Sequence, residues 1–253
     1  MARRICTLLV VSACLVANVR AQSDAQLPNA PTPWPNAPTL RNLPRNLLHD
    51  QGGIWTSPYR ASEGDAVMGL FFIASAGALG SEDTNIMQHH FLNLSTANHA
   101  NSASTGLTGL IAGLPIAYFG IGHLTHNTAA EQTGMLAGEA MVDAVAVNEV
   151  FKIASRRERP TLDNARGHFF QPGVGFESSF ASNHSVLAWS SATVIASESD
   201  HRLVKIAAYG LATGVSVTRV IGRDHFPSDV YVGSAVGWMI GRYVLRHHTR
   251  EFE

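Results

Sequence analysis

The sequence predicts an all-α protein, a helical bundle of about six core helices, and two observations lead to this fold class. Segments rich in small apolar residues recur from about residue 62 to residue 246. No segment shows the period-two alternation of polar and apolar side chains that is typical of a strand, and no internal repeat is present. With 253 residues, the chain is long enough to bury a full core.

Composition limits the partners that the protein is expected to have. The formal net charge is −1, so no overall electrostatic field attracts nucleic acid, and we expect none as a partner. Charged residues make up 15% of the chain and hydrophobic residues 45%. These fractions lie between those of soluble helical proteins and those of membrane proteins, so both a soluble form and an integral membrane form stay open.

The N-terminal segment 1–21 has the three parts of a signal peptide. Arg3 and Arg4 supply positive charge, residues 5–16 are apolar, and Ala21 is a small residue suited to cleavage. Both cysteines lie in this segment, so the mature chain is expected to have neither a disulfide nor a cysteine metal site. The expected location is the periplasm or the cell envelope.

Residues 22–55 are expected to form a linker without a fold of its own. Pro, Asn and Thr dominate much of this segment, and such a composition favours a semi-extended chain. The helical domain is therefore expected to occupy residues 56–253.

The first apolar helix of this domain is expected over residues 62–80, with Ser62 as its N-cap. Its apolar run, 66–80, is shorter than the roughly twenty residues needed to span a bilayer. The next segment, 81–104, is polar and contains the pair His89-His90. Adjacent residues point in different directions on a helix, so we expect no metal ligand there.

Five further helices are expected. Their ranges are 105–124, 131–157, 182–197, 201–221 and 227–246. The third helix of the domain carries Glu139 and Asp143, which share a face because they lie four residues apart. A polar seam inside the bundle is the expected role of this pair, and a role in steering Lys152 is the alternative.

The stretch from Thr218 to Asp229 places an arginine, a histidine and a carboxylate where two helices meet. Gly222 suits a helix end, and Pro227 suits the first turn of the next helix. His225 would then lie on a short loop, and Asp229 could reach back to one imidazole nitrogen and fix its tautomer. Arg219 could present its guanidinium to a phosphoryl group. Ordinary polar caps at a helix junction are the alternative.

Two other segments have features of an anion site. In Lys152-Ile-Ala-Ser-Arg-Arg-Glu-Arg159-Pro160, seven residues make almost two turns, so Lys152 and Arg159 are expected on one helical face, with Pro160 marking the helix end. Around Ser182-Asn183-His184, Ser182 is a candidate N-cap whose following N–H groups would hold a phosphate. His184 could donate a proton to a leaving oxygen.

Taken together, the three segments resemble the signature of the type 2 phosphatidic acid phosphatase and vanadium haloperoxidase superfamily. Its pattern is Lys-x6-Arg-Pro, then Pro-Ser-Gly-His, then Ser-Arg-x5-His-x3-Asp. The first part matches at Lys152, Arg159 and Pro160, and the third at Arg219, His225 and Asp229, with Thr218 in place of serine. The middle part is partly kept, since alanine replaces proline at position 181 and asparagine replaces glycine at position 183.

This resemblance implies a role for each residue. His225 would attack phosphorus and form a phosphohistidine, Asp229 would orient it, and His184 would protonate the leaving group. The phosphoryl oxygens would be held by Lys152, Arg159, Ser182, Arg219 and the backbone N–H of Asn183. No metal or other cofactor is expected in this scheme, because the cations stabilise the negative charge. The Asn183 side chain is expected either to crowd the phosphate pocket or to add a donor.

The segment from Thr161 to Ala181 carries four phenylalanines, at positions 169, 170, 176 and 180. It is expected to be a long loop over the site. Its phenylalanines would form an apolar wall for a lipid or aromatic leaving group, or they would anchor the loop to the bundle.

Three functions follow from the resemblance. The first is a metal-independent phosphatase acting on a phosphomonoester or lipid phosphate, with a phosphorylated small molecule or lipid as its partner and a membrane association left open. The second is a haloperoxidase in which vanadate occupies the same place as a cofactor. The third is a non-catalytic phosphate-binding envelope protein.

Overall fold

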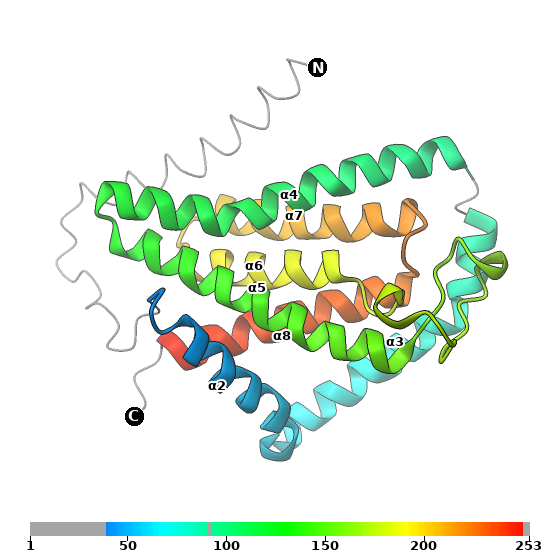
Figure 1. Ribbon diagram of the computed structural model, residues 1–253, viewed down its shortest axis with the longest axis horizontal. Coiled ribbons are helices and arrows are strands. Elements are labelled where there is room, and N and C mark those ends of the chain that lie inside the picture. The colour runs from blue at the N-terminus through cyan, green and yellow to red at the C-terminus, as the bar shows by residue number, and fades with distance from the viewer. Residues whose placement is uncertain (1–38, 91–92, 250–253) are drawn as a thin grey trace.

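The computed structural model describes residues 39–90 and 93–249, and these residues form seven α-helices and no strand (Figure 1). The helices are α2 (Leu43–Thr56), α3 (Glu63–His90), α4 (Leu94–Thr125), α5 (Thr128–Ser155), α6 (Asn183–Glu198), α7 (Arg202–Ile221) and α8 (Pro227–Thr249). The predicted all-α fold is confirmed. The predicted signal peptide and the first part of the predicted linker lie outside the described residues.

Helix α2 was not predicted. Residues 43–55 were expected to be linker, but they form a helix whose Asp50 is fully buried and which packs on α5 and α8. The prediction is therefore wrong for this part of the linker. Pro44 gave a misleading signal, because a proline in the first turn of a helix has no hydrogen bond to lose.

Helices α4 to α8 lie side by side, and α6 is central among them (Figure 1). Ten of its residues are buried, and most of these are alanine, serine or valine. The main core lies around α6 and includes Leu136, Val186, Ile195, Val215 and Val244. Burial of this apolar surface is the main contribution that stabilises the bundle.

Helix α8 approaches α6 closely because glycines repeat at every fourth position on its contact face. A Cβ atom at Gly237 would lie 2.3 Å from the carbonyl oxygen of Val186, and one at Gly241 would lie 2.9 Å from that of Ser190. At Gly233 the contact is the carbonyl oxygen of Ser182, at 2.8 Å. The glycine face thus sets the distance between α8 and the N-terminus of α6.

Helices α3 and α4 are longer than predicted. Helix α3 begins after Ser62, as predicted. The Ser62 hydroxyl accepts a hydrogen bond from the backbone N–H of Asp65, and the Asp65 carboxylate accepts one from the backbone N–H of Ser62. It then continues through the polar segment to His90, which makes 28 residues, and α4 has 32. The short apolar run therefore underestimated the length of α3.

Among the described residues, three helices are long and apolar enough to cross a membrane, namely α3, α4 and α7. None of the most apolar part of α3 is buried within the protein. Its exposed side chains include Val67, Leu70, Phe71 and Ile73, each more than 60% exposed. This length and composition are compatible with membrane association.

Replacement of Gly237 by alanine is expected to destabilise the fold by about 1–3 kcal/mol, because α8 would be forced away from α6. The measurement is the urea midpoint of the purified protein. The matched control is Gly210→Ala in α7, where an added Cβ meets no atom within 4 Å. The control should be neutral or slightly stabilising, and equal midpoints for both variants would contradict the close approach.

Candidate active site

Four helix ends meet at one end of the bundle, together with the loop between α5 and α6 (Figure 1). They are the C-terminal ends of α5 and α7 and the N-terminal ends of α6 and α8. The eight predicted site residues all lie at these ends or in the segments that join them. They are Lys152, Arg159, Ser182, Asn183, His184, Arg219, His225 and Asp229.

His225 lies in the short turn between α7 and α8, as predicted, and only 2% of it is exposed. Its Nδ1 atom lies 2.7 Å from the carbonyl oxygen of Ser179. A carbonyl can only accept, so Nδ1 carries the proton and donates it, which leaves the lone pair on Nε2. Burial, with Arg219 and Arg159 nearby, holds the pKa of His225 well below its ordinary value, so the ring is neutral.

The predicted bond between Asp229 and His225 is not present. The Asp229 Oδ2 atom is 4.0 Å from His225 Nδ1, beyond hydrogen-bonding distance. Instead, Oδ2 accepts hydrogen bonds from the Ser179 hydroxyl at 2.5 Å and from the Phe226 backbone N–H at 2.9 Å. Asp229 therefore positions Ser179, and it is the Ser179 carbonyl that orients the imidazole.

Arg157 completes this arrangement, although the sequence analysis did not select it. Its guanidinium is buried between Asp83 of α3, at 2.8 Å, and Asp229 of α8, at 2.6 Å. It also lies over the rings of Phe169 and Phe226, at 4.7 and 4.1 Å from their centroids. Arg157 could not be recognised from the sequence, because it lies between two other charged residues. Only its burial in the folded protein distinguishes it from Arg156.

Lys152 and Arg159 come together in a way that differs from the prediction. Helix α5 ends at Ser155, and Arg156 takes a left-handed conformation with φ of 42°, so Arg159 is not on the helix. The loop instead returns to the helix end: Lys152 Nζ donates to the Ser178 carbonyl at 2.6 Å, and Arg159 Nε donates to the Glu177 carbonyl at 3.1 Å. The predicted helical face was wrong, because the chain reverses at Arg156.

Among the described residues, the buried polar atoms without a hydrogen-bond partner include Nε of Arg219 and the hydroxyl oxygen of Ser182. Arg219 pairs with Asp224 at 2.9 Å through Nη1. Ser182 occupies the N-cap position of α6, as predicted, but its hydroxyl caps no backbone group. Buried donors left unpaired are costly, so this place is prepared for a ligand that accepts hydrogen bonds.

The Asn183 side chain does not crowd the candidate phosphate pocket at the N-terminus of α6. Its side-chain oxygen accepts a hydrogen bond from Asn148 at 2.5 Å, and its amide donates to Glu149 at 2.5 Å. Both partners belong to α5, so the side chain is held against that helix. The first N–H groups of α6 have no acceptor within the helix, and they carry the positive end of its dipole.

His184 lies in the first turn of α6. Burial is the main cause that lowers its pKa to about 4, and Arg219, Arg159 and Lys152 lower it further. Burial and Arg159 also lower the pKa of Lys152. These cations oppose any further positive charge, so the cluster favours an anion.

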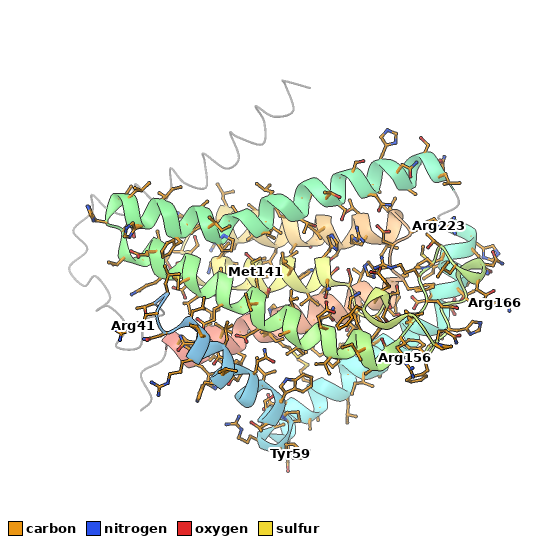
Figure 2. The ribbon with its side chains drawn as sticks, in the orientation of Figure 1. Arg41, Tyr59, Met141, Arg156, Arg166 and Arg223 are labelled. Atoms are coloured by element: carbon orange, nitrogen blue, oxygen red, sulfur yellow. The ribbon has the colours of Figure 1, made fainter. Side chains whose placement is uncertain are left out.

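The four phenylalanines of the loop divide between the two predicted roles. Phe169 packs edge-on against Phe180, with ring centroids 5.8 Å apart, and also covers Arg157, so it anchors the loop. Phe170 and Phe176 are 67% and 65% exposed and are available to a ligand. Figure 2 shows Arg156, Arg166 and Arg223 at this same end of the molecule, where they add to its positive charge.

Glu139 and Asp143 are not part of this site. Asp143 precedes Lys152 by nine residues, which is about 14 Å along a helix, and the Lys152 ammonium bonds to the carbonyls of Phe176 and Ser178. Burial is the main cause that raises the pKa of Glu139 and that of Asp143 to about 7. The pair forms a buried polar seam, and the alternative role in steering Lys152 has no support.

Replacement of Arg157 by methionine is expected to lower stability by about 3–5 kcal/mol, because it leaves two carboxylates buried without a cation. The measurement is the free energy of unfolding in urea. The control is Arg166→Met, at an exposed position in the same loop, which should change stability by about 0.5 kcal/mol or less. Similar losses in the two variants would show that Arg157 is not the centre of this network.

Binding of an anion is expected to raise the pKa of His184, because the anion offsets the cations that lower it. In the free protein, His184 is then neutral above about pH 5, and in the complex it holds its proton to higher pH. The measurement is an NMR titration of the histidine ring with and without saturating vanadate, with the signal assigned by comparison with His184→Gln. An unchanged pKa would contradict the proposed proximity of the anion to His184.

Comparison with known proteins agrees with the three motifs. Residues 133–253 match the model of the PAP2 superfamily. This segment begins within α5 and contains all eight predicted site residues. No curated protein matches the chain, and no solved structure does. This match covers a little under half of the chain, and it agrees with the predicted resemblance to the type 2 phosphatidic acid phosphatase superfamily.

Proposed function

We propose that this protein is a metal-independent phosphatase that hydrolyses phosphomonoesters or lipid phosphates through a phosphohistidine at His225. The match of residues 133–253 to the PAP2 superfamily supports phosphatase activity in general. The observation that carries the proposal is the state of His225. It is neutral, its Nδ1 is bound to the Ser179 carbonyl, and its Nε2 keeps the lone pair that a nucleophile needs.

In the first step, Nε2 of His225 attacks phosphorus. A P–N bond forms, the bond from phosphorus to the leaving oxygen breaks, and His184 gives its proton to that oxygen. In the second step, His184 accepts a proton from water as the water oxygen attacks phosphorus. The P–N bond then breaks, its electron pair returns to Nε2, and inorganic phosphate is released.

The cations stabilise the charge that builds on the equatorial oxygens of the transferring group. Lys152 uses two of its three donors on carbonyl groups, which leaves one for a phosphoryl oxygen. Arg219 contributes Nε, and Ser182 contributes its hydroxyl. Arg159 and the first N–H groups of α6 complete the set. This density of donors allows the chemistry to proceed without a metal.

Asp229 supports the nucleophile indirectly. Asp229 is the negative residue in the middle of the chain Arg157–Asp229–Ser179, and it holds the segment whose carbonyl accepts a hydrogen bond from His225 Nδ1. A carbonyl in this position fixes the tautomer as a carboxylate would, while the Asp229 carboxylate stays 4.0 Å from Nδ1 without a direct bond to the ring. The nucleophile stays neutral because burial and the nearby arginines lower the pKa of His225.

Association with a membrane through the apolar face of α3 fits a lipid substrate. Phe170 and Phe176 are exposed beside the site and suit an apolar leaving group. Export to the periplasm or cell envelope, on the basis of the N-terminal segment, completes the proposal. A phosphatase in that place would act on phosphate esters outside the cytoplasm.

Vanadate would fit the same donors, with Nε2 of His225 as its ligand, so a haloperoxidase is the second candidate. A silent phosphate binder is the third, but the position of Asn183 disfavours it, because the side chain lies against α5 and leaves the N-terminus of α6 open.

The test is hydrolysis of an aryl phosphate by the purified protein in chelator, with and without detergent. We expect turnover that vanadate inhibits, and a phosphorylated protein whose label is stable in alkali and lost in acid. His225→Ala should lower kcat about 10³-fold or more and remove the label. The control is His99→Ala, at an exposed position on α4.

Full turnover in His225→Ala would exclude this residue as the nucleophile. Halide oxidation by peroxide in the presence of vanadate, without phosphate ester hydrolysis, would favour the haloperoxidase. A detergent requirement for turnover would support a membrane-associated form.

A further inference from the structure

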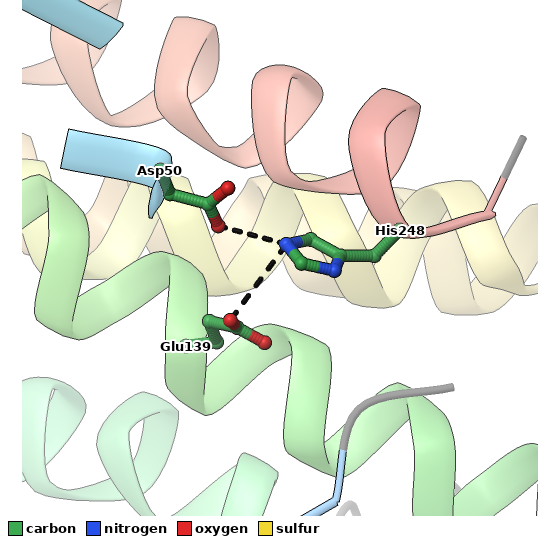
Figure 3. A group of neighbouring side chains, drawn as sticks. All are labelled: Asp50, Glu139 and His248. Atoms are coloured by element: carbon green, nitrogen blue, oxygen red, sulfur yellow. Dashed lines mark hydrogen bonds and ion pairs between the residues drawn. The ribbon is translucent and has the colours of Figure 1, made fainter. Parts of the chain in front are cut away.

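A second cluster of ionisable side chains, two of them buried and one half-buried, lies away from the candidate active site. Asp50 of α2, Glu139 of α5 and His248 of α8 each offer one ligand atom, and these atoms lie within 4.8 Å of one another. Figure 3 shows both carboxylates directed at the imidazole ring from different helices. The 13 residues from Glu139 to Lys152 correspond to about 20 Å along α5, so the two sites are separate.

Glu139 is the feature that indicates a missing ligand. Its side chain is 0% exposed, yet neither carboxylate oxygen has a hydrogen-bond partner among the described residues. The amide of Asn46 lies nearby without forming a bond of normal geometry. Within the described part of the chain, Glu139 pairs with His248, whose Nε2 is 3.7 Å from Oε1, too far for a hydrogen bond. A buried carboxylate without donors is costly unless a cation joins it.

Asp50 is in a similar state. It is fully buried, and its Oδ2 lies 2.8 Å from Nε2 of His248, but no described residue forms a hydrogen bond with its Oδ1. His49 Nδ1 is 3.8 Å from Oδ1, and the His49 side chain is 76% exposed. Each carboxylate of the cluster thus keeps at least one free oxygen inside the protein.

The neighbouring residues hold this geometry. Gln51 follows Asp50 on α2, and its amide donates to both the side chain and the backbone carbonyl of Asp143, at 2.8 and 3.1 Å. These bonds fasten α2 to α5 beside Glu139. Asp143 adds a third buried carboxylate, and its Oδ2 also has no partner. The region therefore holds more negative than positive groups.

We propose that Asp50, Glu139 and His248 bind a divalent transition metal of the zinc type. Two carboxylate oxygens and one imidazole nitrogen suit Zn²⁺ or Mn²⁺ better than Mg²⁺ or Ca²⁺, which prefer oxygen ligands alone. In a tetrahedral zinc site, bonds of about 2.0–2.2 Å place ligands about 3.3–3.5 Å apart. The separations of 2.8 and 3.7 Å at His248 Nε2 lie on either side of this range, so small side-chain rotations suffice.

The metal would take the place of the proton shared by His248 Nε2 and Asp50 Oδ2, so binding releases a proton. It would join the first described helix to the last one through α5. Such a site is structural, because the charge that it neutralises lies far from the phosphate chemistry. The expected absence of a metal in the catalytic scheme is unaffected.

The test uses the full chain, purified without a histidine tag and stripped with chelator. Titration with zinc chloride, followed by calorimetry, should give one strong site per chain. At zinc concentrations about 100-fold above Kd, the thermal midpoint should rise by about 5–10 °C. The variants Glu139→Gln and His248→Asn should each weaken zinc binding by about 100-fold or more.

Two comparisons make the outcome decisive. Without zinc, Glu139→Gln should be at least as stable as the wild type, because it removes a buried charge; this shows that the variant folds. The matched control is His168→Asn, since His168, Glu158 and Asp163 form a similar but more exposed group. The proposal would be overturned if the wild type bound no zinc, if Glu139→Gln still bound it, or if His168→Asn lost the binding.

Discussion

The buried ion pairs of Arg157 are the interaction on which the candidate active site depends. The guanidinium joins Asp83 of α3 to Asp229 of α8 at 2.8 and 2.6 Å, and two aromatic rings cover it. Through Asp229 and Ser179 the same network sets the carbonyl that fixes the tautomer of His225. A buried charge needs partners on every side, so each element in contact with Arg157 has one allowed position.

Small residues make this precision possible. Glycines at every fourth position of α8 bring its backbone against the carbonyls of α6, including that of Ser182 at the start of the helix. The N–H groups of α6, the cations of α5 and α7, and the histidine after α7 then reach one place. With larger side chains along α8, the helix ends would separate, and an anion could contact only some of these donors at once.

The molecule keeps uncompensated charge of opposite sign in two places. At one end, burial and the cations Arg219, Arg159 and Lys152 lower the pKa of both histidines, which favours a bound anion. Around Glu139, buried carboxylates lack donors, which favours a bound cation. In both places the burial of polar or charged groups raises the free energy of the folded protein, and a bound ligand of the opposite charge lowers it.

The sequence by itself determined the fold class, and it selected the eight candidate site residues that the structure brings to one end of the bundle. Helix caps, apolar periodicity and the spacing of Lys152, Arg219 and His225 are local features. Local features can be recognised in the sequence without knowledge of the tertiary structure. The tertiary structure alone decided how those residues are held. Arg157 and Asp83 are 74 positions apart, the partner of His225 is a backbone carbonyl, and the cluster around Glu139 unites three distant helices. Contacts of this kind depend on burial and long-range packing, which residue spacing does not encode.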